Sequence, residues 1–276
     1  MRILATVLLV LAPVHGQWVK YPTPGVPRTA DGKPDLSAPA PRTASGRPDL
    51  SGMWLPKDEV PCPKMILDDA GTCAERVAPS RQAVNIAFGI PGGLPLQPWA
   101  AELIKKRAVN AGRDDPHTHC LPSNFPRLFT LPHITKILQN PGQVTLLNEF
   151  NASYRQIFTD GRALPVDPQP SWNGYSTGRW QGDELVVETI GFRDDLWMDM
   201  QGTPLTSAAK VTERFRRPNF GMLEIQALVD DPKAYTKPWT VNFQMHIVVD
   251  TELIDEICLE GERSLEHIPV QSTPSK

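Results

Sequence analysis

Three aspartates close together in the chain form the first group of residues that could do chemistry. Asp194, Asp195 and Asp199 bracket Trp197 and follow an alternating run over residues 184–190. A strand that ends before these acids would place them in a loop at one rim of a sheet. Paired carboxylates can divide the roles of general acid and general base when burial raises the pKa of one of them. An exposed acidic loop and a calcium loop are the alternatives, although the spacing lacks the regular alternation and the glycine of a calcium-binding loop.

A histidine on a later strand could act with these acids. Residues 239–249 place Trp239, Phe243 and other apolar side chains on one face, while Asn242 and His246 lie on the other. Imidazole titrates near neutrality, so His246 would be a useful acid or base if the polar face lined a pocket. An apolar interior is the commoner filling of a barrel, and it would instead place His246 on the outer surface.

Two glutamates interrupt apolar stripes. Glu213 and Glu224 each alternate with apolar neighbours, and a buried carboxylate would need a partner. Arg155, Arg214 and Arg216 are the candidate partners. Such a pair would serve the structure or would read a ligand.

Histidine pairs offer a weaker indication of metal chemistry. His117, His119 and His133 could chelate a transition metal through imidazole nitrogens, but they lack a regularly spaced further ligand. We therefore predict no metal and no cofactor. The sequence also lacks the Gly-x-Ser-x-Gly, phosphate-loop, Cys-x-x-Cys and His-Glu-x-x-His motifs, which removes support for familiar hydrolase and nucleotide chemistries.

The elements that would position these residues are mainly β-strands. Alternation and regularly spaced turn residues predict nine strands, near 133–139, 143–150, 153–159, 175–181, 184–190, 208–217, 221–229, 239–249 and 252–259. Short connections between them favour an antiparallel meander closed as a lipocalin-like barrel whose interior could hold a small ligand. A β-sandwich is the alternative. One helix is expected from Pro98 to about Val109.

The N-terminal part reads differently. Residues 1–16 resemble a short secretory signal peptide, and residues 17–97 form a Pro-rich arm. This arm contains a ten-residue repeat, 28–37 and 42–51, whose copies differ at two positions. We interpret it as a duplicated turn-forming strap, the second copy docking through Met53 and Trp54. The barrel domain with its leading helix would span 98–265, and 266–276 would be a tail.

Cysteines and charge restrict the compartment and the partners. Of the three possible pairings we favour Cys62 with Cys73 and Cys120 with Cys258, with four free thiols as the alternative. The net charge of −3, from 28 basic and 31 acidic residues, favours neither nucleic acid nor an anionic membrane surface as a partner. After the first residues, no apolar run is long enough to span a membrane, so no membrane insertion is expected. The oligomeric state cannot be read from the sequence.

Several blocks resemble a known group of proteins. They are the Gly-x-Trp-x-Gly-Asp hairpin within 174–199, Asn-Pro-Gly at 140–142, Asp-Gly-Arg at 160–162, Glu-Arg-Phe-Arg-Arg at 213–217 and Asp-Pro-Lys-Ala-Tyr at 231–235. Over about 110–265 the chain resembles a large family of uncharacterised exported bacterial proteins, for which the resemblance implies no settled activity. Relatives often carry histidines where this chain has Thr203, Leu205 and Lys210, so any chemistry of those histidines is absent here.

Two functions are compatible with these observations. The first is a periplasmic or secreted barrel that binds a small, partly apolar molecule. Its ligand would contact aromatic and polar side chains of the barrel: Trp180, Trp197, Glu213, Arg214 and Trp239. The second is an enzyme on the same barrel, an isomerase, hydratase, cyclase or hydrolase, in which one of the three aspartates acts with His246.

Overall fold

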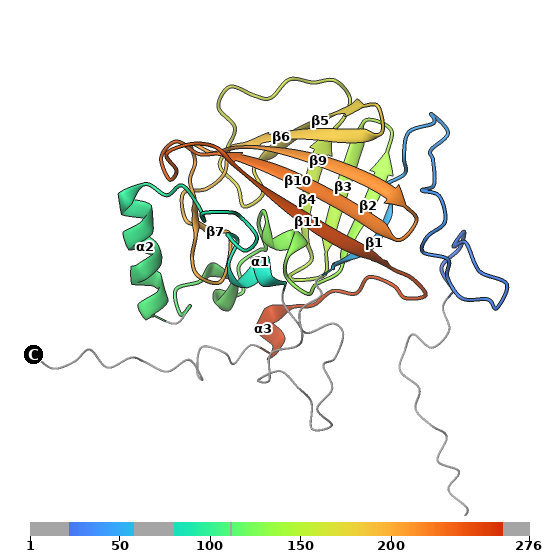
Figure 1. The fold of residues 1–276 in the computed structure, drawn as a ribbon, viewed down its shortest axis with the longest axis horizontal. Helices are drawn as coiled ribbons and strands as arrows, with labels where there is room; N and C mark the ends of the chain where they lie inside the picture. The colour runs from blue at the N-terminus through green and yellow to red at the C-terminus, as the bar shows by residue number, and fades with distance from the viewer. Residues whose placement is uncertain (1–21, 58–79, 111, 262–276) are drawn as a thin grey trace, which may run out of the picture.

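A closed nine-stranded barrel forms the centre of the protein (Figure 1). The computed structural model describes residues 22–57, 80–110 and 112–261, so the expected signal peptide and C-terminal tail lie outside the described residues. The strands follow the order β1-β11-β10-β9-β6-β5-β4-β3-β2 around the barrel. They are β1 (Gly52–Pro56), β2 (Thr135–Asn140), β3 (Gln143–Asn148), β4 (Ser153–Phe158), β5 (Tyr175–Gln181), β6 (Glu184–Ile190), β9 (Lys210–Asn219), β10 (Met222–Asp230) and β11 (Trp239–Val248). The predicted mainly β fold and barrel are confirmed, and the sandwich is excluded.

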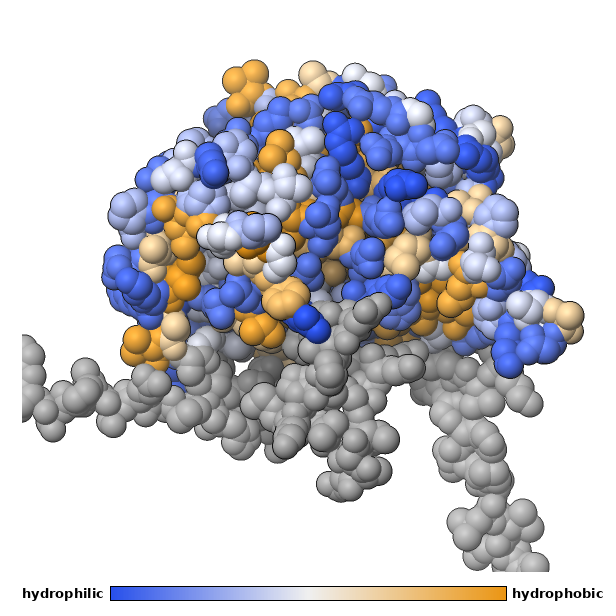
Figure 2. Space-filling view, viewed as in Figure 1, coloured by the Kyte–Doolittle hydropathy of each residue, from blue (hydrophilic) through white to orange (hydrophobic). Residues whose placement is uncertain are grey.

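Alternation along the strands separates an apolar interior from a polar exterior. On β11, Trp239, Phe243 and Met245 are buried, whereas Asn242 and Gln244 are exposed. Figure 2 shows that hydrophilic residues dominate the face over β9, β10 and β11. The inward side chains pack into one continuous apolar core, so protein side chains fill the interior that the sequence predicted to hold a ligand.

The strand that closes the barrel comes from the N-terminal arm. β1 pairs with β11 through Met53 and Val248, and with β2 through Gly52 and Ile137. The prediction of a ninth strand at 252–259 is wrong, because β1 occupies the edge of β11 that such a strand would need. This edge position also makes residues 52–56 part of the barrel, although they precede the range 98–265 expected for it.

The direction of one strand also differs from the expected antiparallel meander. Residues 159–174 carry the chain back along the barrel, so β5 runs parallel to β4. This seam contains only the pairs Ile157 with Ser176 and Phe158 with Thr177. A short parallel contact leaves the two strands weakly joined where the rest of the wall has longer ladders.

Short elements cover one end of the barrel. The predicted helix is confirmed as α2 (Pro98–Val109), and Figure 1 shows it on the same side as β7 (Leu196–Trp197), which pairs with β8 (Pro204–Leu205). The remaining elements are α1 (Arg81–Val84), the 3-10 helices η2 (Pro116–His119) and η3 (Arg127–Phe129), and α3 (Cys258–Gly261). Among the described residues, no helix has the length and apolar character needed to cross a membrane.

A disulfide ties the C-terminal segment to the barrel. Cys120 and Cys258 are bonded, which confirms this predicted pair. Cys258 lies in α3 and not in a last strand, so the bond joins the loop after η2 to α3. The predicted bond between Cys62 and Cys73 falls outside the described residues.

Candidate functional site

A cleft opens where β4 and β5 diverge. On β5, Ser176 and Thr177 pair with β4. Upstream of them, Ser171 forms a β-bridge with Phe192, which follows β6. Gly174 supports this path, because its φ of +63° and the 2.6 Å between an added Cβ and the Ile190 carbonyl oxygen leave room for glycine alone. The edge of β4 is therefore separated from residues 171–175.

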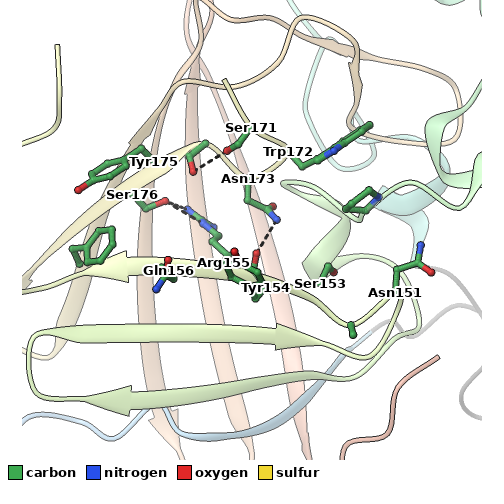
Figure 3. Close-up of a pocket in the computed structure, with 14 residues that line it drawn as sticks. Asn151, Ser153, Tyr154, Arg155, Gln156, Ser171, Trp172, Asn173, Tyr175 and Ser176 are labelled. Atoms are coloured by element: carbon green, nitrogen blue, oxygen red, sulfur yellow. Dashed lines mark hydrogen bonds between the residues drawn. The ribbon is translucent and has the colours of Figure 1, made fainter. Parts of the chain in front are cut away.

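Aromatic side chains line this β4–β5 cleft, which has a volume of about 510 Å³. Tyr154 and Phe158 come from β4. Trp172 and Tyr175 come from the opposite side, as Figure 3 shows. The Phe158 and Tyr175 rings lie 5.3 Å apart between centroids, and the Arg193 guanidinium lies 4.7 Å from the centre of the Trp172 ring. The walls therefore offer flat apolar surfaces to a ligand.

A buried ion pair closes the inner side of the cleft. Arg155 is 2% exposed and Glu213 is 0% exposed. Nη1 of Arg155 donates to Oε1 of Glu213 at 2.9 Å, and Nη2 donates to the other carboxylate oxygen. Nη2 also donates to the hydroxyls of Ser176 and Thr189. The prediction that Glu213 needs an arginine partner is confirmed, with Arg155 as the partner.

This ion pair replaces missing backbone pairing at the seam. Arg155 lies on β4, and its partners lie on β5, β6 and β9, so one guanidinium joins four strands across the interior. Removing one partner of a buried pair costs about 3–5 kcal/mol, because the other charge stays buried without compensation. We infer that Arg155 and Glu213 hold the shape of the cleft and that Glu213 neutralises the Arg155 charge.

Asn173 lines the cleft and carries an unsatisfied polar atom. Its side chain is directed toward β4, where Nδ2 donates to the Tyr154 carbonyl at 3.4 Å and also to the Ser123 carbonyl at 3.3 Å (Figure 3). Asn173 is only 8% exposed, and its Oδ1 is buried without a hydrogen-bond partner among the described residues. A buried acceptor left unpaired costs about 1–3 kcal/mol, so this oxygen favours a ligand that donates a hydrogen bond.

The three predicted catalytic aspartates have separate structural environments. Asp194 accepts a hydrogen bond from the Ser207 backbone N–H at 2.8 Å, and this contact lowers its pKa. Asp195 forms a bidentate pair with Arg193, whose hydrogen bonds lower the pKa of Asp195. Through Arg193, Asp195 is connected to the Trp172 side of the cleft.

Asp199 lies inside the protein. It is 0% exposed, and its carboxylate accepts hydrogen bonds from the backbone N–H groups of Ile86 and Thr203 and from the Thr203 hydroxyl. Burial raises the pKa of Asp199, while these hydrogen bonds act in the opposite direction. These contacts join the turn between β7 and β8 to the residues that follow α1. The role they indicate for Asp199 is structural.

His246 does not join the aspartates. It lies on the outward face of β11, seven residues from Trp239, which corresponds to about 23 Å along a strand. Trp239 packs against Tyr235, whose hydroxyl donates to the Pro204 carbonyl beside β7. The acids and His246 are therefore near opposite ends of the barrel.

The predicted ligand-binding residues also fail to meet in one place. Trp180 lies near Arg47 of the strap, with 5.9 Å from the guanidinium to the ring, and Trp197 is buried beneath Arg107. Trp239 belongs to the core and packs against Tyr235 near β8, away from Trp180. Arg214 lies on the outside, 3.4 Å from Glu184. Of the predicted set, Glu213 alone contributes to the β4–β5 cleft through Arg155.

Glu224 corrects another expectation. It pairs with Arg216 on the outer face of the barrel, because Leu223, Ile225 and Ala227 take the inward positions of β10. The inward-facing residues of β10 are therefore shifted by one position from the stripe that contains Glu224. Because side chains alternate along a strand, a shift of one residue moves Glu224 to the outer face.

Residues 171–175 were missed as a site because no alternation marks them. The Asn-Gly pair at 173–174 was the available signal, since such pairs mark places where a chain leaves regular structure. No family model, curated protein or solved structure matches the chain. The geometry of the cleft is thus the basis for inferring a function.

Proposed function

We propose that the protein binds a small, partly apolar molecule in the β4–β5 cleft, and that this molecule donates a hydrogen bond to Asn173. The observation that carries the proposal is Asn173 in the wall of an aromatic-lined cleft, with a buried Oδ1 that has no hydrogen-bond partner among the described residues. A volume of about 510 Å³ lies within the ~300–1,000 Å³ usual for ligand pockets.

The charge of the cleft supports a neutral ligand. Arg155 is the cation nearest its inner side, and its two hydrogen bonds to Glu213 neutralise it. An anionic ligand would have to compete with Glu213 for the same guanidinium. A ring or short chain that carries an alcohol or an amide would fit the aromatic walls and the Asn173 acceptor together.

Binding is better supported than acid and base catalysis. Asp194 and Asp195 have lowered pKa values, so both favour the ionised form, and Asp199 is surrounded by its own hydrogen bonds. We also propose that the protein is exported to the periplasm or secreted. The apolar N-terminal run supports export, and the disulfide between Cys120 and Cys258 supports an oxidising compartment.

Ligand-observed NMR with a matched pair of probes tests the binding proposal. Benzyl alcohol donates a hydrogen bond and benzyl methyl ether does not, so we expect saturation transfer to the alcohol and at least several-fold weaker binding of the ether. Asn173→Leu should remove this preference, and Trp172→Ala should weaken both probes because an aromatic wall is lost.

Trp99→Ala is the matched control. Trp99 lies on α2 outside the cleft, where its indole N–H donates to the Lys233 carbonyl, so its removal should leave both probes unaffected. Equal binding of alcohol and ether by the unmodified protein would refute the role of Asn173. An unchanged alcohol signal in folded Trp172→Ala would place the binding site elsewhere.

A further inference from the structure

Three side chains that could hold a metal ion come from distant parts of the chain and meet where β2 begins and β3 ends. His133 precedes β2, Glu149 follows β3, and Glu256 lies in the segment that leads to α3. One ligating atom from each lies within 4.8 Å of both others. Nδ1 of His133 and Oε2 of Glu256 are 3.0 Å apart, and Oε1 of Glu149 accepts the Ile134 backbone N–H at 2.7 Å.

The backbone holds the two glutamates beside each other. The Glu256 N–H donates to the Glu149 carbonyl at 2.8 Å, and the Asn151 N–H donates to the Glu256 carbonyl at 2.7 Å. Two residues later, the Cys258 N–H donates to the Asn151 side chain, and Cys258 is bonded to Cys120. The position of Glu256 is therefore set by hydrogen bonds and a covalent bond, although no strand contains it.

Aromatic packing fixes the histidine. The Phe150 ring lies 4.9 Å from the His133 ring and is stacked on His117 at 4.2 Å. Phe150 is itself buried, so it presents a rigid surface to the imidazole. The His133 side chain is 14% exposed, whereas that of Glu256 is 50% exposed. The group thus has one fixed inner side and one side open to water.

We propose that His133, Glu149 and Glu256 bind a divalent first-row transition-metal ion such as Zn²⁺. Such ions bind imidazole nitrogen and carboxylate oxygen at about 2.0–2.2 Å, which places neighbouring ligand atoms roughly 3.3 Å apart. Nδ1 of His133 and Oε2 of Glu256 are already 3.0 Å apart, and the ligating atoms of all three residues lie within 4.8 Å of one another.

The proposed ion is distinguished from calcium by the nitrogen ligand. Calcium takes about six to eight oxygen ligands, whereas His133 supplies nitrogen and the three side chains leave positions for water. The sequence indicated His117 and His119 as possible partners of His133 in a metal site. Nε2 of His119 instead contacts the Arg113 carbonyl at 2.8 Å. In the proposed site the other two ligands are Glu149 and Glu256.

Calorimetric titration of the chelator-treated, disulfide-bonded full chain with ZnCl₂ tests this site. We expect one ion per chain, and a loss of affinity of about 10-fold or more in His133→Ala, Glu149→Gln and Glu256→Gln. Glu149→Gln keeps a carbonyl acceptor for the Ile134 N–H, and Glu256 is half exposed, so both variants should fold. Circular dichroism checks this.

Two neighbouring variants are the controls. Glu252→Gln removes an acid of the same segment that pairs with Lys136, and His119→Ala removes a nearby imidazole. Both should bind Zn²⁺ as the unmodified protein does. The proposal fails if the unmodified chain binds no stoichiometric Zn²⁺, if Glu149→Gln and Glu256→Gln keep full affinity, or if CaCl₂ binds as tightly as ZnCl₂. These outcomes do not depend on whether the β4–β5 cleft binds a ligand.

Discussion

The two copies of the ten-residue repeat have the same local structure. In residues 28–37 the Thr29 N–H donates to the Lys33 carbonyl at 2.8 Å, and in residues 42–51 the Thr43 N–H donates to the Arg47 carbonyl at 2.9 Å. The first arginine of each copy donates to the carbonyl of the glycine four residues later. Copies that differ at two of ten positions thus form the same turn in two surroundings.

Their contacts with the barrel are different. Leu50 of the second copy is 0% exposed, whereas the equivalent Leu36 is 43% exposed. The Leu50 N–H donates to the Gln139 side chain, which in turn donates to the Pro48 carbonyl, and the chain then enters β1. Short-range chemistry therefore produces the turn, whereas the surroundings of each copy determine how much its residues contribute to stability.

Truncating the two leucines should give the largest difference between the copies. Leu50→Ala should lower the free energy of unfolding by about 2–5 kcal/mol, because it removes a fully buried side chain. Leu36→Ala should change it by no more than about 0.5 kcal/mol. Urea denaturation of both variants measures the difference, and equal losses would show that the second copy is not anchored through Leu50.

Replacing the turn glycines should show the similarity of the copies. Gly32 has a φ of +81° and Gly46 a φ of +78°, and an added Cβ would meet nothing within 4 Å at either position. Gly32→Ala and Gly46→Ala should therefore each cost about 1–2 kcal/mol from backbone strain alone. Thermal and urea unfolding would measure this, and a cost confined to one copy would contradict the shared local origin of the turn.

The smallest expected effect concerns the acid that each copy contacts. Hydrogen bonding to Arg42 is the main cause that lowers the pKa of Asp183, whereas the Thr23 N–H is the main cause for Asp250, ahead of Arg28. Arg42→Ala should return the pKa of Asp183 toward 3.8, and Arg28→Ala should leave that of Asp250 lowered. Carboxyl ¹³C titration measures both values.

The sign of the associated stability change follows from linkage. Because both pKa values are lowered in the folded protein, each contact stabilises the fold above pH 3.8 and is lost as the pH falls through the folded pKa. Arg42→Ala should reduce this acid sensitivity more than Arg28→Ala. An equal response of the two acids would mean that the copies hold their partners in the same way.

Much of the scaffold could be predicted from local pattern. Alternation over 239–249 correctly divided the residues of β11 between its two faces, and proline followed by basic residues indicated the helix at Pro98–Val109. The unusual position of Glu213 indicated a buried partner. These predictions succeeded because each depends on neighbours one to four residues apart.

The candidate sites could not be predicted in the same way. Trp172 and Asn173 lie in a segment without periodicity, and the cleft exists because β5 pairs with only two residues of β4. His133, Glu149 and Glu256 are brought together across 123 residues by strand register and by the Cys120–Cys258 bond. Nothing in the local pattern of any one of them indicates the other two.

Local sequence pattern was enough to predict the period of the strands, the duplicated turn, the helix and the need of Glu213 for a cation. Tertiary packing was needed to bring β1 into the barrel, to fill the interior with side chains, and to bring His133, Glu149 and Glu256 together. The reason is the range of the forces involved. Backbone dihedral preferences and alternation act between near neighbours, whereas closure and site formation depend on which distant surfaces pack together and in which register.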